Sequence, residues 1–168
     1  FGFNAASTVN ANVSIGRIAL NTHLAACSAA VAYFLFALLM RKAILIRTTI
    51  NASLGGLVGI TAGCATMSPV FAVFTGLMAG LIVSILPSLI EKMRIDDVVD
   101  AVTVHGFCGA WGTIAAGLFY ETNMFNAEIV GVQALGVVMG FVWGFGIAFI
   151  VFKVLHVVLG GLRVSAQH

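Results

Sequence analysis

The chain is poor in charged residues. Its 168 residues include 8 Lys or Arg and 6 Asp or Glu, which together make up 8% of the sequence. A soluble domain usually carries about 25% charged residues, so these are too few to cover a water-exposed surface. The net charge of +2 is also too small to indicate nucleic-acid binding. The scarcity of charge therefore excludes an ordinary soluble domain and favours a membrane protein.

Cysteine is scarce as well, and its pattern carries no chemistry. Cys27, Cys64 and Cys108 lie in apolar segments without CxxC or histidine spacing. We expect them to be small buried side chains, neither a disulfide framework nor a metal site. The sequence also lacks a nucleophile–base pair and a phosphate-binding loop, so we expect neither an enzyme nor a bound cofactor. The first residues lack an initiator methionine and a basic start, which predicts an excerpt of a longer protein.

Hydrophobic residues, at 61%, dominate the chain. Runs long enough to cross about 30 Å of hydrocarbon occupy residues 18–40, 70–90, 98–120 and 129–152. A shorter, glycine-rich run at 50–67 is a further candidate. None of these runs alternates with period two, which excludes a membrane β-barrel. We therefore predict an all-α polytopic membrane helix bundle with five spans, preceded by the end of another helix at residues 1–7.

Basic residues indicate how the bundle is oriented. They occur in alternate connections and after the last run, at Arg41, Lys42, Arg47, Lys92, Arg94 and Arg163. The connections at 66–69 and 121–128 contain none, and Arg17 is the exception to the alternation. By the positive-inside tendency, the basic loops and the C-terminus are cytoplasmic. The last apolar run continues to Leu159 and would be about 46 Å long as a helix, so we expect it to tilt or to project from the membrane.

Small residues predict close helix packing in two runs. Gly76 and Gly80 are four residues apart, and Gly136, Gly140 and Gly144 repeat that spacing in the last run. Residues four apart share a helix face, and faces of small residues let helix backbones approach closely in lipid. The glycines of the last run could serve contacts within a subunit or between subunits.

One histidine interrupts the apolar run at 98–120. His105 would lie about 10 Å inside it, counted from Val98. An ionisable group inside a membrane span by default indicates a transport path or proton relay; the alternative is a packed histidine that donates to a backbone carbonyl. Gly109 and Gly112 are expected to share its helix face. Three carboxylates precede the run, at Asp96, Asp97 and Asp100. They could bind a cation, but we favour a structural role as helix caps, for Asp97 and Asp100 in particular.

Four long blocks resemble the ammonium transporter (Amt/Rhesus) family. They cover residues 1–7 (FGFNAAS), 51–64 (NASLGGLVGITAGC), 96–119 (DDVVDAVTVHGFCGAWGTIAAGLF) and 161–165 (GLRVS). Together they are collinear over almost the whole chain. The resemblance implies that Phe1 falls in the sixth of eleven helices. Residues 1–168 would then form the C-terminal half of the transmembrane domain, the second inverted repeat plus a long last helix, with one partial and five full spans.

The resemblance also implies roles for individual residues. Ser7 would receive ammonium at the outer vestibule, Phe3 would be the phenyl gate beneath it, and His105 would be one of two pore histidines that relay a proton. The whole protein would be a homotrimer in the plasma membrane that transports ammonium or ammonia for nitrogen uptake. Its further partners would be membrane lipid and a cytoplasmic regulatory protein or fused signalling domain.

The chain departs from the family pattern at a few positions. Ala6 and Ala52 stand where the family usually has glycine, and Val98 and Thr103 stand where proline is common. Thr103 lies two residues before His105 and could reshape the inner pore. A divergent pore would suit the alternative function, a membrane ammonium-sensor domain fused to a signalling domain.

Overall fold

The computed structural model describes residues 2–8 and 14–162 and contains α-helices with one π-helical segment. The elements are α1 (Gly2–Ala6), α2 (Ser14–Leu39), α3 (Ile46–Ile60), α4 (Pro69–Lys92), the π-helix η1 (Val102–Phe107), α5 (Cys108–Leu118) and α6 (Ala127–Val158). Three of these helices, α2, α4 and α6, are long and apolar enough to cross a membrane. The prediction of an all-α membrane bundle is confirmed. Arg163, one of the basic residues from which the orientation is predicted, lies outside the described residues.

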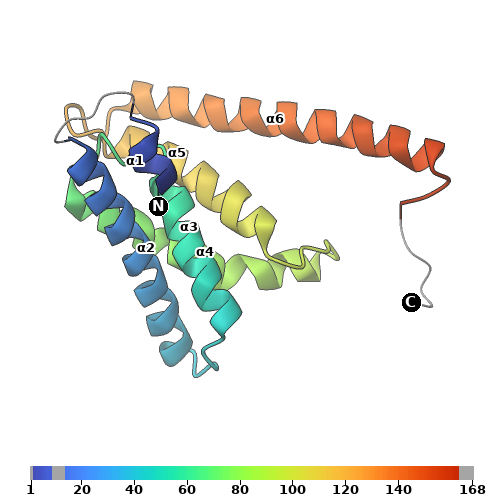
Figure 1. Cartoon of the computed structure of the whole chain (residues 1–168), viewed down its shortest axis with the longest axis horizontal. Helices are drawn as coiled ribbons and strands as arrows, with labels where there is room; N and C mark the ends of the chain where they lie inside the picture. Colours follow the sequence, from blue (N-terminus) through green and yellow to red (C-terminus); the bar gives the residue numbers. More distant parts are fainter. Residues whose placement is uncertain (1, 9–13, 163–168) are drawn as a thin grey trace.

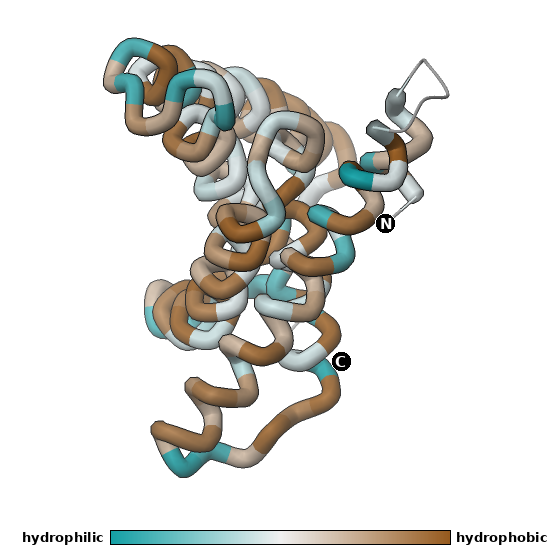
Figure 2. The backbone as a smooth tube through the Cα atoms, turned by 90° about the vertical axis from the view of Figure 1, so that its left-hand side faces the viewer, coloured by the Kyte–Doolittle hydropathy of each residue, from teal (hydrophilic) through white to brown (hydrophobic). Residues whose placement is uncertain are grey.

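The helices α2, α3, α4 and η1–α5 pack into one bundle, and α1 lies against α2 (Figure 1). The backbone trace is hydrophobic along most of each helix, with hydrophilic stretches mainly in the connections (Figure 2). Glycine lets the backbones approach within the bundle. A Cβ atom on Gly76 or Gly80 of α4 would collide with the backbone of Ala25 or Ala29 in α2. The predicted close packing of this pair of glycines is confirmed.

The helix α3 ends at Ile60, earlier than the predicted run at 50–67, and residues 61–66 form turns. Side chains of α2 bind carbonyl groups in the turns that follow α3. The Asn21 side-chain amide donates to the carbonyls of Cys64 and Met67, at 2.9 Å each, and Arg17 also donates to the Met67 carbonyl. These bonds satisfy carbonyl groups at Cys64 and Met67, the part of the turns that is buried beside α2.

Arg17, the exception to the basic-loop pattern, forms an ion pair with Glu121 in the connection between α5 and α6. The pair joins the start of α2 to that connection. A carboxylate partner therefore neutralises the one basic residue that lies on the side predicted to be outside.

The predicted span at 98–120 begins later and is interrupted. Residues 98–99 form a turn, the π-helix η1 occupies Val102–Phe107, and α5 ends at Leu118. Asp100 adopts the left-handed conformation, with φ of 58°. This conformation cannot continue a right-handed helix, so it fixes the start of the helical segment beyond the predicted Val98.

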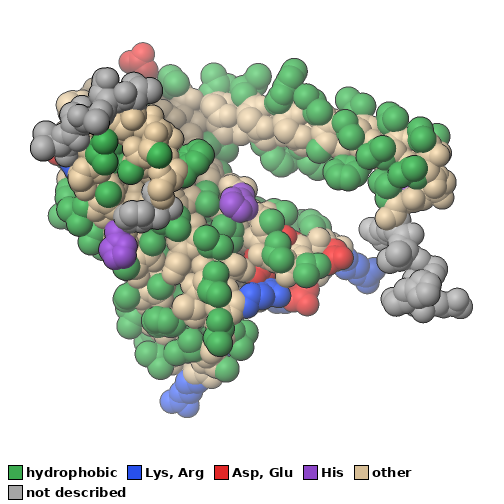
Figure 3. Space-filling model, in the orientation of Figure 1, with side chains coloured by type: hydrophobic (Ala, Val, Ile, Leu, Met, Phe, Trp, Pro, Cys, Tyr) green, Lys and Arg blue, Asp and Glu red, His purple; other side chains and the backbone are tan. Residues whose placement is uncertain are grey.

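The long last helix, α6, leaves the bundle (Figure 1). At 32 residues it extends about 48 Å, and hydrophobic side chains cover it (Figure 3). It contacts only α5 among the described elements, with Gly117 of α5 against Val130 and Gln133. No described group lies within 4 Å of a Cβ built on Gly136, Gly140 or Gly144, so the predicted close contact is not formed within this part of the chain.

The prediction for cysteine is confirmed at two positions and wrong at the third. Cys64 and Cys108 are buried in the bundle, but Cys27 is exposed on α2, with its sulfur 3.5 Å from Nε2 of His23. Apolar composition predicts a lipid-facing position as readily as a buried one, since lipid and core are both apolar.

Candidate functional site

A hollow of about 530 Å³ lies between α1, the end of α3 and the η1–α5 segment. Its lining combines aromatic, aliphatic and neutral polar groups. The lining residues are Phe3, Asn4, Leu57, Val58, Thr61, Ala62, His105, Gly109 and Thr113. Two predicted site residues, Phe3 and His105, therefore line the same hollow although they are far apart in the sequence. None of these described residues is Lys, Arg, Asp or Glu.

His105 lies within the π-helix, and this changes which residues share its face. His105, Gly109 and Thr113 line the hollow, whereas the predicted partner Gly112 faces α3. A Cβ on Gly112 would collide with the backbone of Gly59. The prediction for Gly112 was wrong because a π-helix has a wider turn than the α-helix on which the predicted spacing rested.

The start of the chain forms the second wall. Phe3 is 74% exposed, and the Ser7 hydroxyl donates to the Phe3 carbonyl at 2.6 Å. Ser7 itself does not line the hollow. Asn4 is buried, and its side-chain amide donates to the Thr22 hydroxyl of α2 at 3.0 Å. This bond holds the short helix α1 against the bundle and so fixes the position of Phe3.

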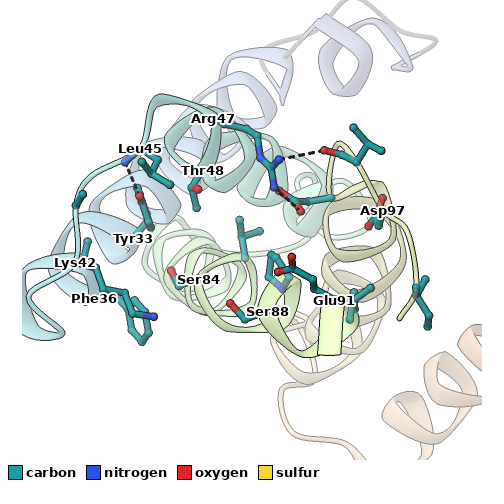
Figure 4. Close-up of a pocket in the computed structure, with 18 of the residues that line it drawn as sticks. Tyr33, Phe36, Lys42, Leu45, Arg47, Thr48, Ser84, Ser88, Glu91 and Asp97 are labelled. Atoms are coloured by element: carbon teal, nitrogen blue, oxygen red, sulfur yellow. Dashed lines mark hydrogen bonds and ion pairs between the residues drawn. The ribbon is translucent and has the colours of Figure 1, made fainter. Parts of the chain in front are cut away.

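A second cavity, of about 410 Å³, lies at the other end of the bundle (Figure 4). It is bordered by the ends of α2, α3 and α4 and by the connection that carries the three aspartates. Tyr33 accepts a hydrogen bond from the Leu45 amide at 2.8 Å across its wall. Among the described residues, no group of three metal-ligating side chains could hold a metal ion.

Two aspartates of this cavity, Asp97 and Asp100, bind groups of the protein itself. The Asp97 carboxylate accepts bonds from the amides of Ala101 and Val102, at 2.8 Å each, and so binds free amides at the start of the helical segment from outside its N-cap position. Asp100 is buried, at 5% exposure, and its carboxylate accepts from Arg47 at 3.0 and 3.1 Å and from Asn51 at 2.8 Å.

The same two side chains of α3 also bind the backbone next to Asp100. Arg47 donates to the Val98 carbonyl, and Asn51 donates to the Val99 carbonyl, at 3.2 Å each. These bonds anchor the start of the helical segment that carries His105 to the start of α3.

Sequence reasoning missed three polar residues that line the hollow: Asn4, Thr61 and Thr113. Thr113 lies eight residues after His105, and in an ideal α-helix that spacing places it about 80° around the helix from His105, so an α-helical count does not select it. Thr61 directly follows α3. The sequence predicted that this position would lie within the span at 50–67 and gave no sign that the helix ends there. Asn4 is polar and buried in a segment too short for any periodic signal.

The membrane-length helices and this uncharged hollow beside them define part of a multi-pass membrane protein. The whole chain, residues 1–168, matches the model of the Ammonium Transporter Family. The chain belongs to that family, which consists of transporters and not enzymes, as the sequence predicted.

Individual relatives agree with the family assignment. The ammonium transporter Amt2 of Archaeoglobus fulgidus is 37% identical over 183 aligned residues, which cover 99% of this chain and 39% of the relative. The ammonium transporter Amt2 of Methanocaldococcus jannaschii is 32% identical over 169 residues, again covering 99% of this chain and 39% of the relative. The chain thus spans about two fifths of the length of these relatives.

Solved structures show the same fold. A structure described as a sensor Amt protein superposes with a TM-score of 0.90 at 38% identity, over 98% of this chain and 42% of that one. Mep2 of Candida albicans superposes with a TM-score of 0.88 over 99% of this chain and 40% of that one. Its identity of 21% supports the fold alone.

Proposed function

We propose that this chain supplies one wall of a transmembrane path for ammonium or ammonia. The observation that carries the proposal is the hollow that Phe3 and His105 line together, in a chain that belongs to the ammonium transporter family. The other wall would come from the part of the protein that precedes Phe1, because the relatives are about two and a half times as long.

Each residue has a role that its chemistry can perform. Ser7 receives ammonium at the outer vestibule, where a hydroxyl oxygen can accept an N–H bond. Phe3 forms the gate, and the face of its ring attracts a cation that approaches from outside. His105 accepts or passes on the proton, because an imidazole nitrogen can bind a proton and release it to a neighbouring group. Deprotonation lowers the cost of crossing the apolar region, since an uncharged molecule needs far less solvation.

Replacement of His105 in the full-length protein tests this path. We expect His105→Ala to lower ammonium flux into liposomes or to weaken selection against potassium, while the protein remains folded. His156→Ala is the matched control, because His156 lies in the last turn of α6 and lines neither cavity. The proposal fails if flux, proton coupling and selectivity in the His105 variant all equal those of the control.

The proposal extends to assembly and orientation. The whole protein forms a homotrimer in the plasma membrane with a separate path in each subunit and with the C-terminus in the cytoplasm, where a regulatory protein can bind. Mass measurement in mild detergent tests the trimer. Covalently linked trimers with one His105 variant subunit should keep about two thirds of the flux, whereas complete loss would contradict independent paths.

A second function is favoured by one specific comparison. The similarity to a structure described as a sensor Amt protein, at 38% identity, supports a membrane ammonium sensor. In that case a signalling domain, such as a kinase, cyclase or phosphatase domain, follows His168 in the full-length protein. Sequencing the full gene decides between the two: a short tail supports the transporter and a signalling domain supports the sensor.

A further inference from the structure

Two threonines line the hollow without a part in the proposed path. Thr61 directly follows α3, and Thr113 lies in α5, two helical turns after His105. Both are open to the hollow, and the walls around them are largely apolar, formed by Phe3, Leu57 and Val58. A hydroxyl group in such surroundings forms stronger hydrogen bonds than it would in water.

The two threonines lie at the same level of the bundle because α3 and η1–α5 run side by side in the same direction. At one end Asn51 binds the carbonyl of Val99, and at the other the Glu121 amide donates to the Thr66 carbonyl at 3.0 Å. Between these ends, a Cβ on Gly109 would lie 3.7 Å from Val58.

Thr61 comes three residues after Val58, and Thr113 comes four residues after Gly109. Each is therefore about one turn beyond the contact between the two helices, on the side of the Thr66–Glu121 end. Their oxygens come from the end of α3 and from α5, and both line the same hollow.

Both hydroxyl protons are already used. Thr61 donates to the Leu57 carbonyl at 2.8 Å, and Thr113 donates to the Gly109 carbonyl at 2.9 Å. A threonine hydroxyl has one proton and two acceptor positions, so each oxygen offers the hollow acceptor positions alone. A pair of such oxygens matches a ligand that carries several N–H donors and no acceptor.

We propose that Thr61 and Thr113 form an acceptor-only binding subsite for ammonium and small primary ammonium ions. This subsite deepens the proposed function and rests on it, because the ligand must reach the hollow by the same path. Within the described lining no carboxylate is available to pair with a cation. The neutral oxygens therefore hold the ion through N–H bonds weakly enough for it to leave.

Equilibrium binding of methylammonium to the full-length protein in detergent, measured by calorimetry, tests the subsite without relying on transport. We expect Thr113→Val to weaken the Kd about tenfold, which corresponds to about 1.4 kcal/mol. Thr113→Ser keeps the hydroxyl oxygen and should restore binding to within about twofold. Thr61→Val provides a second test, at the other threonine of the hollow, if a variant at 113 does not fold.

Thr49→Val is the matched control. Thr49 of α3 makes the same bond, to the Leu45 carbonyl at 2.9 Å, but lines neither cavity, so its Kd should equal that of the unaltered protein. Tetramethylammonium has no N–H group, and its binding should not respond to any of these changes. The subsite is refuted if Thr113→Val and Thr61→Val both bind methylammonium as the control does. If His105→Ala abolishes flux in that case, the proposed path stands without the subsite.

Discussion

The contact between Gly112 and Gly59 allows a sharp test of how α3 and α5 pack. A Cβ on Gly112 would come closer to the carbonyl oxygen, the carbonyl carbon and the Cα of Gly59 than any real Cβ approaches other atoms. All three are backbone atoms, so no side-chain rotation can relieve the collision. Gly112→Ala must therefore push the two helices apart. Overpacking typically costs about 1–3 kcal/mol, and a backbone collision belongs at the upper end of that range.

Gly59→Ala, the same change on the other helix of this contact, is the control. A Cβ on Gly59 would lie 3.4 Å from the Cβ of Ala79 and 3.7 Å from the carbonyl of Cys108, which is close to ordinary packing. Replacing a helical glycine with alanine gains up to about 1 kcal/mol of helix propensity. We expect Gly112→Ala to destabilise the protein by about 2 kcal/mol after this gain and Gly59→Ala to leave stability unchanged or slightly raised.

The difference of about 2–3 kcal/mol is a change of roughly 30- to 150-fold in the folded-to-unfolded ratio. Reversible unfolding of the full-length protein in mixed micelles measures it. Equal unfolding free energies for the two variants would refute the close α3–α5 contact.

Three further outcomes follow from the bundle. A membrane-permeant maleimide should label the exposed Cys27 in the folded protein, but it should label the buried Cys108 only after denaturation. Mass spectrometry of the labelled protein measures this order, and the reverse order would contradict the positions of the two cysteines. Arg17→Gln should cost about 1 kcal/mol of unfolding free energy, and Glu121→Gln less, because Arg17 keeps its bond to the turn after α3. Asp100→Ala should lower the free energy of unfolding by about 2 kcal/mol, because it removes the charged acceptor of Arg47 and Asn51, and Asp100→Asn should lower it less. An unchanged free energy of unfolding in both variants would contradict these hydrogen bonds.

The sequence predicts the long helices well because a long run of apolar residues is enough to indicate each of them. The runs at 18–40, 70–90 and 129–152 correspond to α2, α4 and α6, with ends shifted by up to six residues. Lipid and the bundle interior both favour apolar side chains, so a long apolar run indicates a helix without any knowledge of its neighbours.

The two shorter spans were harder to predict because contacts between distant segments set their ends. α3 stops at Ile60 since Asn21, on another helix, binds the carbonyls beyond it. The segment before His105 starts late because Asp100 takes a left-handed conformation held by Arg47. Neither cause can be read from the residues of the segment itself.

In the candidate site, too, some features could be predicted from the sequence and others depend on contacts or local geometry that the sequence does not reveal. The pairing of Phe3 with His105 followed from the family resemblance, since no local pattern connects residues a hundred positions apart. Counting along an ideal α-helix then selected Gly112 instead of Thr113, because the count could not foresee the π-helix. Hydroxyl groups that bond to their own helix also leave no trace in composition.

The distribution of charge agrees with the proposed path, in which the ion would meet neutral groups. The ion pair of Arg17 lies at one end of the bundle and that of Arg47 with Asp100 lies at the other, so both are remote from the middle of the helices. Between them the described lining of the hollow has an imidazole and hydroxyl oxygens but no fixed charge. A carboxylate there would bind an ammonium ion strongly and hold it, whereas a wholly apolar wall would exclude it. In the proposed path, neutral acceptors beside the imidazole would neither hold the ion as strongly as a carboxylate nor exclude it as an apolar wall would. Binding of the ion and its release would then each involve a modest change in free energy.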